Sequence, residues 1–302
     1  MQEYSNDLHM RNMTDEEYKL RCYKARKIRK KRRKERRRKA AIKLAFILLI
    51  IVVLIGGMVI KKKKIIKEET SVSSADSEVD ASDSSSEQEK KLHIIETSDE
   101  YPDDMVEFAK KYPEAIDYVY NYPELKDKSE NIDLSKEAGT DDVPLLLQWD
   151  SRWGYISYGS GLIGYTGCGP VSLSMAALYL THNKEWTPKK VAEIANEKGY
   201  CVPGSGSSWT LISEGCQYVG LSAQTLSLDE TVMKNALDAG EPIIVVVGPG
   251  DFTFSGHFMV ITGYNENGFT INDPNSTKNS MLTWDFERLS KQIQNMWAMS
   301  KM

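Results

Sequence analysis

The sequence predicts an α+β domain over residues 141–302, preceded by a single transmembrane helix over residues 40–60. Two observations predict the domain. Candidate helices come first along its chain, and candidate strands joined by short turns follow, which is typical of the α+β class. A third observation, an apolar run interrupted only by Lys43, predicts the transmembrane helix.

Capping residues and glycines mark the ends of the expected helices. These helices cover residues 171–180, 188–199 and 208–220, and a fourth runs from a capping box at residues 227–230 to Gly240. The expected strands cover residues 243–247, 257–264 and 269–272, with weaker candidates at 281–284 and 296–299. A turn at residues 265–268 makes the second and third strands a hairpin.

Opposite charges divide the chain. Residues 1–39 hold 16 Lys and Arg against 6 Asp and Glu, whereas the whole chain carries a net charge of −4. As a helix, residues 40–60 would extend roughly 30 Å, the thickness of a bilayer core, and no small-x-small cleavage site ends them. Because the stronger basic flank is N-terminal, the positive-inside rule predicts that residues 1–39 are cytoplasmic and that everything after residue 60 is outside the cell.

We therefore expect a single-pass protein of the cell membrane that contacts the lipid bilayer through residues 40–60. A basic helix can also bind nucleic acid. The basic segment 1–39 directly abuts the apolar run, so we interpret it as facing lipid and expect no nucleic-acid partner.

Two segments are expected between the transmembrane helix and the domain. Residues 61–98 are rich in Ser, Asp and Glu; too few apolar residues are present to bury a core, so a disordered tether is predicted. Residues 99–140 carry a Tyr-Pro-acidic triplet three times, at 101–103, 112–114 and 122–124. Each Pro suits a helix start, which favours a short helical stalk packed on the domain over a separate binding module.

The stretch Gly167-Cys168-Gly169-Pro170 brings a cysteine to the first turn of the expected helix 171–180. The glycines allow a tight backbone, and Pro170 suits the first helical turn. A helix N-terminus carries roughly half a positive charge, which favours a thiolate over a thiol. Cys168 is therefore a candidate nucleophile, although a small buried residue in a tight turn fits this stretch equally well.

A cysteine nucleophile needs a base, and the base needs an orienting group. His257 begins one strand of the expected hairpin, and Asp273 closes the other. Adjacent antiparallel strands place such residues side by side, so the two can pair by local geometry alone. The alternative is that the histidine merely ends a strand, that the aspartate merely belongs to a turn, and that neither has a catalytic role. His182 lies at the far end of the helix, roughly 20 Å from Cys168, and is not expected to reach the thiol.

Several stretches together resemble family thirty-nine of the cysteine peptidases, whose founders remove double-glycine leaders from bacteriocin precursors. The closest resemblance is to the stand-alone bacterial branch of that family. The matching stretches, in the family's order, are residues 143–154, 167–170, 206–209, 256–264 and 271–274. The resemblance implies a papain-like fold in which an N-terminal helical part bears the cysteine and an antiparallel sheet bears the histidine and aspartate.

The same resemblance implies a role for each site residue. Cys168 would be the nucleophile, His257 the base and Asp273 the orienting group. Gln148 corresponds to the glutamine whose side-chain amide forms the oxyanion hole with the Cys168 N–H. Twenty residues separate Gln148 from Cys168, against only a few in the leader peptidases, so the segment 155–164 must loop out. Those peptidases are also usually domains of cytoplasm-facing transporters, whereas no Gly-Lys-Thr motif occurs in this sequence.

The expected function is that of a membrane-anchored extracellular cysteine peptidase or amidase that acts on peptide or cell-wall peptide substrates through a thioester. An acyl- or peptidyl-transferase with the same site, or a non-catalytic surface binding or scaffold protein, are the alternatives. No cofactor is expected, and the four Cys and four His show no metal-ligand spacing. Cys201 and Cys216 could form a disulfide outside the cell, but two buried free thiols are the preferred interpretation.

Overall fold

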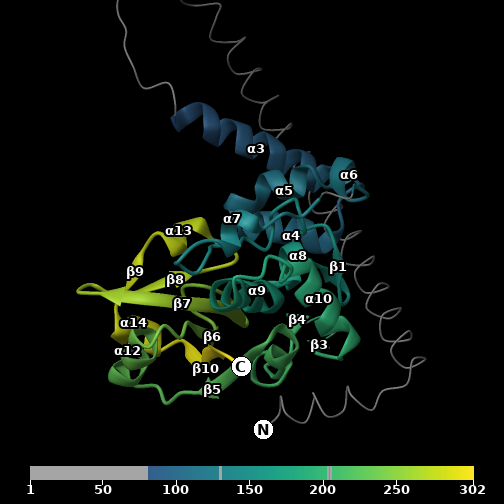
Figure 1. Ribbon diagram of the computed structural model, residues 1–302. Coiled ribbons are helices and arrows are strands. Elements are labelled where there is room, and N and C mark those ends of the chain that lie inside the picture. Colours follow the sequence, from purple (N-terminus) through teal and green to yellow (C-terminus); the bar gives the residue numbers. More distant parts are fainter. Residues whose placement is uncertain (1–80, 129–130, 203, 205) are drawn as a thin grey trace, which may run out of the picture. The chain divides into compact units, whose positions relative to one another are not determined.

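The computed structural model describes residues 81–128, 131–202, 204 and 206–302 (Figure 1). The chain divides into two units, one of residues 13–87 and one of residues 1–12 and 88–302, and nearly all described residues belong to the latter. The predicted basic segment 1–39 and transmembrane helix 40–60 lie outside the described residues. No helix within the described part of the chain is long and apolar enough to cross a membrane.

A six-stranded antiparallel sheet forms the C-terminal part of the domain. Its strands lie in the order β5-β10-β6-β7-β8-β9, so the last strand of the chain lies between β5 and β6. The strands of this sheet are β5 (Leu221–Thr225), β6 (Ile243–Val247), β7 (His257–Asn265), β8 (Gly268–Asn272), β9 (Thr283–Trp284) and β10 (Ile293–Lys301). Two small hairpins precede it, formed by β1 (Ser157–Tyr158) with β2 (Gly161–Leu162) and by β3 (Cys201–Val202) with β4 (Gly206–Ser207).

Both faces of the sheet are covered. Successive side chains of a strand point to opposite faces, and β6 shows this directly. Ile244 and Val246 belong to one apolar core with helix α9, whereas Val245 and Val247 belong to a second core with helix α12. The continuous apolar run of β6 is therefore explained by burial on two sides.

Helix α9 (Cys168–Thr181) packs on β6, β7 and β10 and lies beside the sheet in Figure 1. All its residues from Gly169 to Leu178 are buried, as expected for a helix that is apolar on every side. The other helices of the domain are α8 (Ile163–Thr166), α10 (Pro188–Glu197), α11 (Thr210–Ser213), the 3₁₀-helix η2 (Gly215–Val219), α12 (Glu230–Asp238), α13 (Thr277–Ser280) and α14 (Phe286–Ser290).

The N-terminal part of the described chain is helical. Its elements are α3 (Ala81–Thr97), α4 (Asp103–Lys111), the 3₁₀-helix η1 (Pro113–Ala115), α5 (Ile116–Tyr120), α6 (Tyr122–Leu125) and α7 (Ser135–Ala138). The expectation of a disordered tether over 61–98 is wrong for residues 81–97. Ile95 is completely buried and Leu92 packs in the same apolar cluster, so this end of the acidic segment does bury apolar surface.

The predicted helical stalk packs on the domain through tyrosines. The Tyr118 hydroxyl donates to the Gly154 carbonyl at 2.8 Å, and the Tyr155 hydroxyl donates to the Tyr118 carbonyl at 2.8 Å. The two rings stack with their centroids 4.6 Å apart. Gly164 has no room for a side chain, because a Cβ there would lie 2.2 Å from the Tyr118 hydroxyl. These contacts hold the loop that leads into Cys168.

The strand predictions are largely confirmed. Residues 243–247 form β6 as expected, and the predicted hairpin forms as β7 and β8, each within one residue of its expected ends. The candidate at 296–299 is the centre of the longer strand β10, and β5 was not predicted. The candidate at 281–284 is reduced to the two residues of β9, because α13 and the turn after it occupy the chain up to Leu282.

Two helix predictions need correction. The expected helix 208–220 is broken into α11 and the 3₁₀-helix η2. Gly215 begins η2, and a Cβ on it would lie 2.9 Å from the Tyr200 ring, so packing rather than helical propensity determines this segment. The helix that ends near Gly240 is capped by Asp229, whose side chain accepts from the Val232 N–H, and not by the first residue of the expected capping box.

Candidate active site

Cys168 is the first residue of α9, as the sequence predicted, and its side chain is partly exposed. The N–H groups of a first helical turn have no partner within the helix and point out of its end. Gly169 is needed for close packing, because a Cβ there would lie 2.4 Å from the Ser207 hydroxyl oxygen. The β3–β4 hairpin thus packs against the turn that presents the thiol.

His257 and Asp273 meet as the hairpin predicted. His257 begins β7 opposite Val247, and Asp273 follows the end of β8, where Asn272 pairs with Val260. The His257 Nε2 lies 2.7 Å from the Asp273 Oδ1, and both side chains are buried. The same imidazole acts on the Cys168 thiol, whose pKa it lowers.

The Asp273 carboxylate is held from several directions. Its Oδ1 also accepts from the Asn275 N–H at 2.8 Å, and its Oδ2 accepts from the Asn279 side-chain amide at 2.8 Å. The Asp273 N–H donates to the Ser280 hydroxyl at 2.9 Å. Asn279 and Ser280 belong to α13, so this short helix fixes the rotamer of the aspartate. A carboxylate held in this way can orient the imidazole and stabilise its charged form.

The charges of His257 and Cys168 support each other. Burial by itself lowers the pKa of His257, but the neighbouring Asp273 carboxylate and the Cys168 sulfur outweigh it and raise that pKa to about 10. Burial by itself raises the pKa of Cys168, but the hydrogen bond and charge of His257, with the N–H groups of Phe258 and Gly169, lower it below its usual value. The arrangement favours a thiolate–imidazolium pair.

Gln148 is buried, and its hydrogen bonds join it to the segment before Cys168 and to the residue after Asp273. Its backbone N–H donates to the Pro274 carbonyl at 2.7 Å, next to Asp273, and its side-chain Nε2 donates to the Gly164 carbonyl at 3.1 Å. The long segment between Gln148 and Cys168 therefore loops out through β1 and β2 and returns, as the sequence required. One of the two Nε2 hydrogens is used by Gly164, and the other is available to a further acceptor.

Two residues of the helical segment reach the site without having been predicted there. Burial raises the pKa of the Tyr112 hydroxyl, and the negative charges of Asp273 and Cys168 raise it further, so this phenol lies within electrostatic reach of the site. The Glu114 carboxylate accepts from the Ser276 hydroxyl. The only sequence signal was the Tyr-Pro-acidic repeat, which occurs three times and does not indicate which copy contacts the domain.

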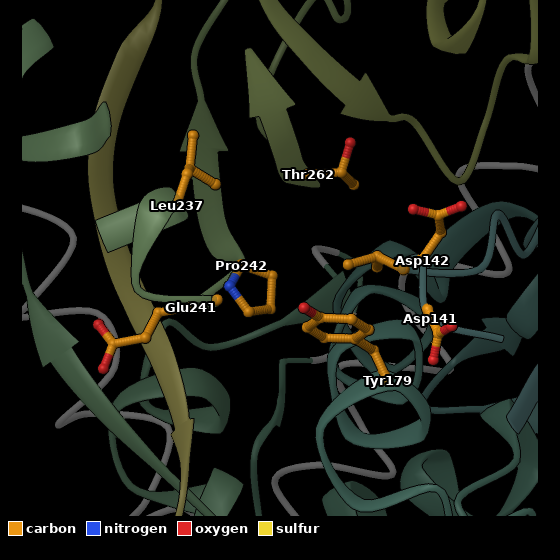
Figure 2. Close-up of a pocket in the computed structure, with 9 residues that line it drawn as sticks. Asp141, Asp142, Tyr179, Leu237, Glu241, Pro242 and Thr262 are labelled. Atoms are coloured by element: carbon orange, nitrogen blue, oxygen red, sulfur yellow. The ribbon is translucent and has the colours of Figure 1, made fainter. Parts of the chain in front are cut away.

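The remaining cysteines and a separate cavity take no part in this cluster. Cys201 and Cys216 are free thiols, and the described residues contain no group of His, Cys, Asp and Glu side chains that could hold a metal ion. Figure 2 shows a cavity of about 60 Å³ in which Tyr179 of α9 lies between Pro242 and the Asp141 and Asp142 side chains. None of Cys168, His257 or Asp273 lines it.

More than half of the chain matches the sequence model of a known protein family. The sequence model of the Peptidase C39-like family matches residues 140–301. Two solved structures are similar. The peptidase domain of Streptococcus ComA, a bifunctional ABC transporter involved in a quorum sensing pathway, is 18% identical with a TM-score of 0.38, over 52% of this chain and 98% of that one. A Bacillus anthracis protein described as a C39-like peptidase is 17% identical with a TM-score of 0.36, over 58% of this chain and 99% of that one. No curated protein matches the chain.

The three thiols of the domain are expected to differ sharply in reactivity. Burial raises the pKa of both Cys201 and Cys216 to about 11, whereas that of Cys168 is lowered. Iodoacetamide at pH 7 should therefore alkylate Cys168 at least about tenfold faster than the other two, because the thiolate is the reacting form. Mass spectrometry of peptides from the treated protein measures the three rates.

The rate at which Cys168 is alkylated should change with pH in one direction. Alkylation of Cys168 should slow as the pH falls through its lowered pKa, and the imidazolium partner should be lost only as the pH rises through about 10. The Cys168→Ser protein is the control for assignment of the fast site. Equal rates at the three cysteines would contradict the account of the site.

Proposed function

The chain belongs to the Peptidase C39-like family, and from this premise we propose that it is a membrane-anchored extracellular cysteine peptidase or amidase that works through Cys168, His257 and Asp273. The observation that carries the proposal is the buried 2.7 Å contact between His257 and Asp273, and the same imidazole lowers the pKa of the Cys168 thiol. A nucleophile, a base and an orienting group in contact are what thiol-dependent acyl transfer requires.

In the proposed reaction the Cys168 thiolate attacks the carbonyl carbon of the scissile peptide or amide bond. A tetrahedral oxyanion forms, and the Cys168 N–H and the free hydrogen of the Gln148 amide are the proposed donors to it. The proton on His257 passes to the leaving nitrogen as the C–N bond breaks, which leaves a thioester on Cys168. His257 then takes a proton from water, the resulting hydroxide attacks the thioester, and the acid product and thiolate are released.

Asp273 keeps the ring in place throughout these steps. Because its Oδ1 binds Nε2, the Nδ1 position is directed at the thiol, and the positive charge on the ring is stabilised while the proton waits for the leaving group. The partly exposed position of Cys168 leaves room for a peptide to approach. Secreted peptides and the peptides of the cell wall are the proposed substrates.

The roles of His257 and Asp273 are tested together. His257→Ala should reduce the rate of peptide cleavage by about 10²–10⁴-fold, the usual contribution of a general acid–base. Asp273→Asn should lose less, because an asparagine oxygen still accepts a hydrogen bond from the ring N–H. The double variant should be no worse than His257→Ala alone, since residues that act as a unit are strongly non-additive.

The measurement is the cleavage rate of the four full-length proteins on one peptide, with products identified by mass. Thermal melting of each variant controls for loss of fold, which matters because removal of one partner of a buried pair is destabilising. Losses that simply add in the double variant would mean that Asp273 acts only as a turn residue before Pro274.

The location outside the cell is part of the proposal and has its own test. Protease added to intact cells should release a soluble fragment that begins between residue 61 and the start of α3, because the proposed anchor at 40–60 precedes it. A cytoplasmic protein of the same cells, which should stay intact, is the control. Cleavage in this region only after lysis would reverse the orientation inferred from the charge of residues 1–39.

A further inference from the structure

Glu114 is the acidic residue of the second Tyr-Pro-acidic triplet, and it lies outside residues 140–301, the part of the chain that the family model matches. Its carboxylate accepts from the Ser276 hydroxyl at 2.5 Å, from the Thr277 N–H at 2.9 Å and from the Lys278 N–H at 3.3 Å. The Thr277 hydroxyl is a further donor to it. All these donors lie at the N-terminal end of α13.

The charge of Glu114 suits these donors. Burial by itself raises the pKa of Glu114, but the hydrogen bonds from Ser276, Thr277 and Lys278 outweigh burial and lower that pKa. The group is therefore an anion at neutral pH, and hydrogen bonds to an ionised acceptor are roughly twice as strong as those between neutral groups. A neutral residue at this position should hold the start of α13 less firmly.

The same short helix holds Asp273. The Asn279 side-chain amide donates to the Asp273 Oδ2 at 2.8 Å, and the Asp273 N–H donates to the Ser280 hydroxyl at 2.9 Å. Ser276 forms a β-bridge with Asp273. The Ser276 hydroxyl accepts from the Asn279 N–H, and its carbonyl accepts from the Ser280 hydroxyl. One turn of helix thus binds Glu114 at its start and Asp273 near its end.

A helix as short as α13 depends on contacts from other parts of the chain. Isolated helices shorter than about 12–15 residues are marginal in water, and α13 has 4 residues, none of them buried. Hydrogen bonds rather than apolar packing must therefore fix its place. The Trp284 indole N–H donates to the Asn279 carbonyl at 3.1 Å, and Glu114 supplies the bonds at the opposite end.

We propose that Glu114 is a positioning residue of the active site: it fixes α13, and α13 in turn fixes the Asp273 carboxyl group against the His257 ring. The reactivity of the Cys168 thiol then depends on a residue that precedes the family domain. The inference rests on the proposed function and deepens it, because it adds a residue that the Cys168 site requires although it does not touch the substrate.

The third triplet provides a matched control within the same chain. Glu124 has the place in its triplet that Glu114 has in the second, and it forms an exposed ion pair with Lys128 at 2.9 Å. Among the described residues no contact joins Glu124 to α13. Glu124→Gln should therefore leave the active site unchanged, whereas Glu114→Gln should not.

The test measures how the rate of alkylation of Cys168 by iodoacetamide depends on pH in the full-length protein. The thiolate is the reacting form, so the pH of half-maximal rate reports the pKa of Cys168, which His257 lowers. In Glu114→Gln this pH should rise by about one unit, which below the midpoint is a tenfold loss of rate. In Glu124→Gln it should not change.

A double variant tests whether Glu114 acts through α13. Asn279→Ala removes the amide that binds the Asp273 Oδ2, and this variant should also raise the pH of half-maximal rate. Because the two residues act through one helix, Glu114→Gln should add little to the shift that Asn279→Ala causes. Shifts that add in full would overturn the inference, because Glu114 would then act by another route.

The other two thiols report the fold in the same sample. Burial raises the pKa of Cys201 and Cys216 to about 11, so both should remain slow in any variant that is folded. If Glu114→Gln makes them fast, its fold is lost and Thr277→Val takes its place. That variant removes one hydroxyl donor to Glu114, and it should shift the pH profile of Cys168 in the same direction by a smaller amount.

An unchanged profile of Cys168 in the folded variant overturns the inference, and so does an equal shift in Glu124→Gln. Failure of the proposed function is a different result, seen in the wild-type protein, if Cys168 reacts no faster than Cys201 and Cys216. That result removes the basis of both proposals.

Discussion

The site depends on one buried hydrogen bond, between the His257 Nε2 and the Asp273 Oδ1 at 2.7 Å. Burial alone disfavours a charged imidazole, and only the adjacent carboxylate and the Cys168 sulfur reverse that effect and raise the pKa of His257 to about 10. The charged ring in turn lowers the pKa of the Cys168 thiol. The His257–Asp273 pair therefore affects both the orientation of the ring and the acidity of the thiol.

Several elements of the fold together position the residues of this hydrogen bond and the thiol beside it. The β7–β8 hairpin sets the two residues next to each other, α13 fixes the aspartate through Asn279 and Ser280, and α9 brings the thiol to the free side of the ring. The helical segment before the family domain is bound to the loop that follows Asp273 through Glu114. The same segment packs on the domain through Tyr118, whose hydroxyl donates to the Gly154 carbonyl and leaves no room for a side chain at Gly164.

The sequence predicted the parts of the site that local structure determines. Cys168 at a helix start follows from Gly167 and Pro170, and the His257–Asp273 pair follows from the turn that sets the register of the hairpin. The role of Gln148 could be inferred only from the family resemblance, because the chain returns to its neighbourhood only after the loop that contains β1 and β2. The sequence could not predict that Tyr112 and Glu114 lie near the site. Three similar triplets occur in the chain, and only tertiary packing determines which of them contacts the domain. The helix at 81–97 was hidden for a related reason: Ile95 is buried by distant residues, which composition does not reveal.

The claim on which the proposed function rests is that His257, held in place by Asp273, lowers the pKa of the Cys168 thiol. The most direct measurement is the ultraviolet thiolate absorbance of the full-length protein as the pH is raised, taken as the difference from Cys168→Ser. This difference should rise at a pH well below about 11, the value to which burial raises the pKa of Cys201 and Cys216. In His257→Ala the pH at which the difference rises should be higher. A difference that appears only together with the other two thiols, or that is the same in His257→Ala, would contradict it.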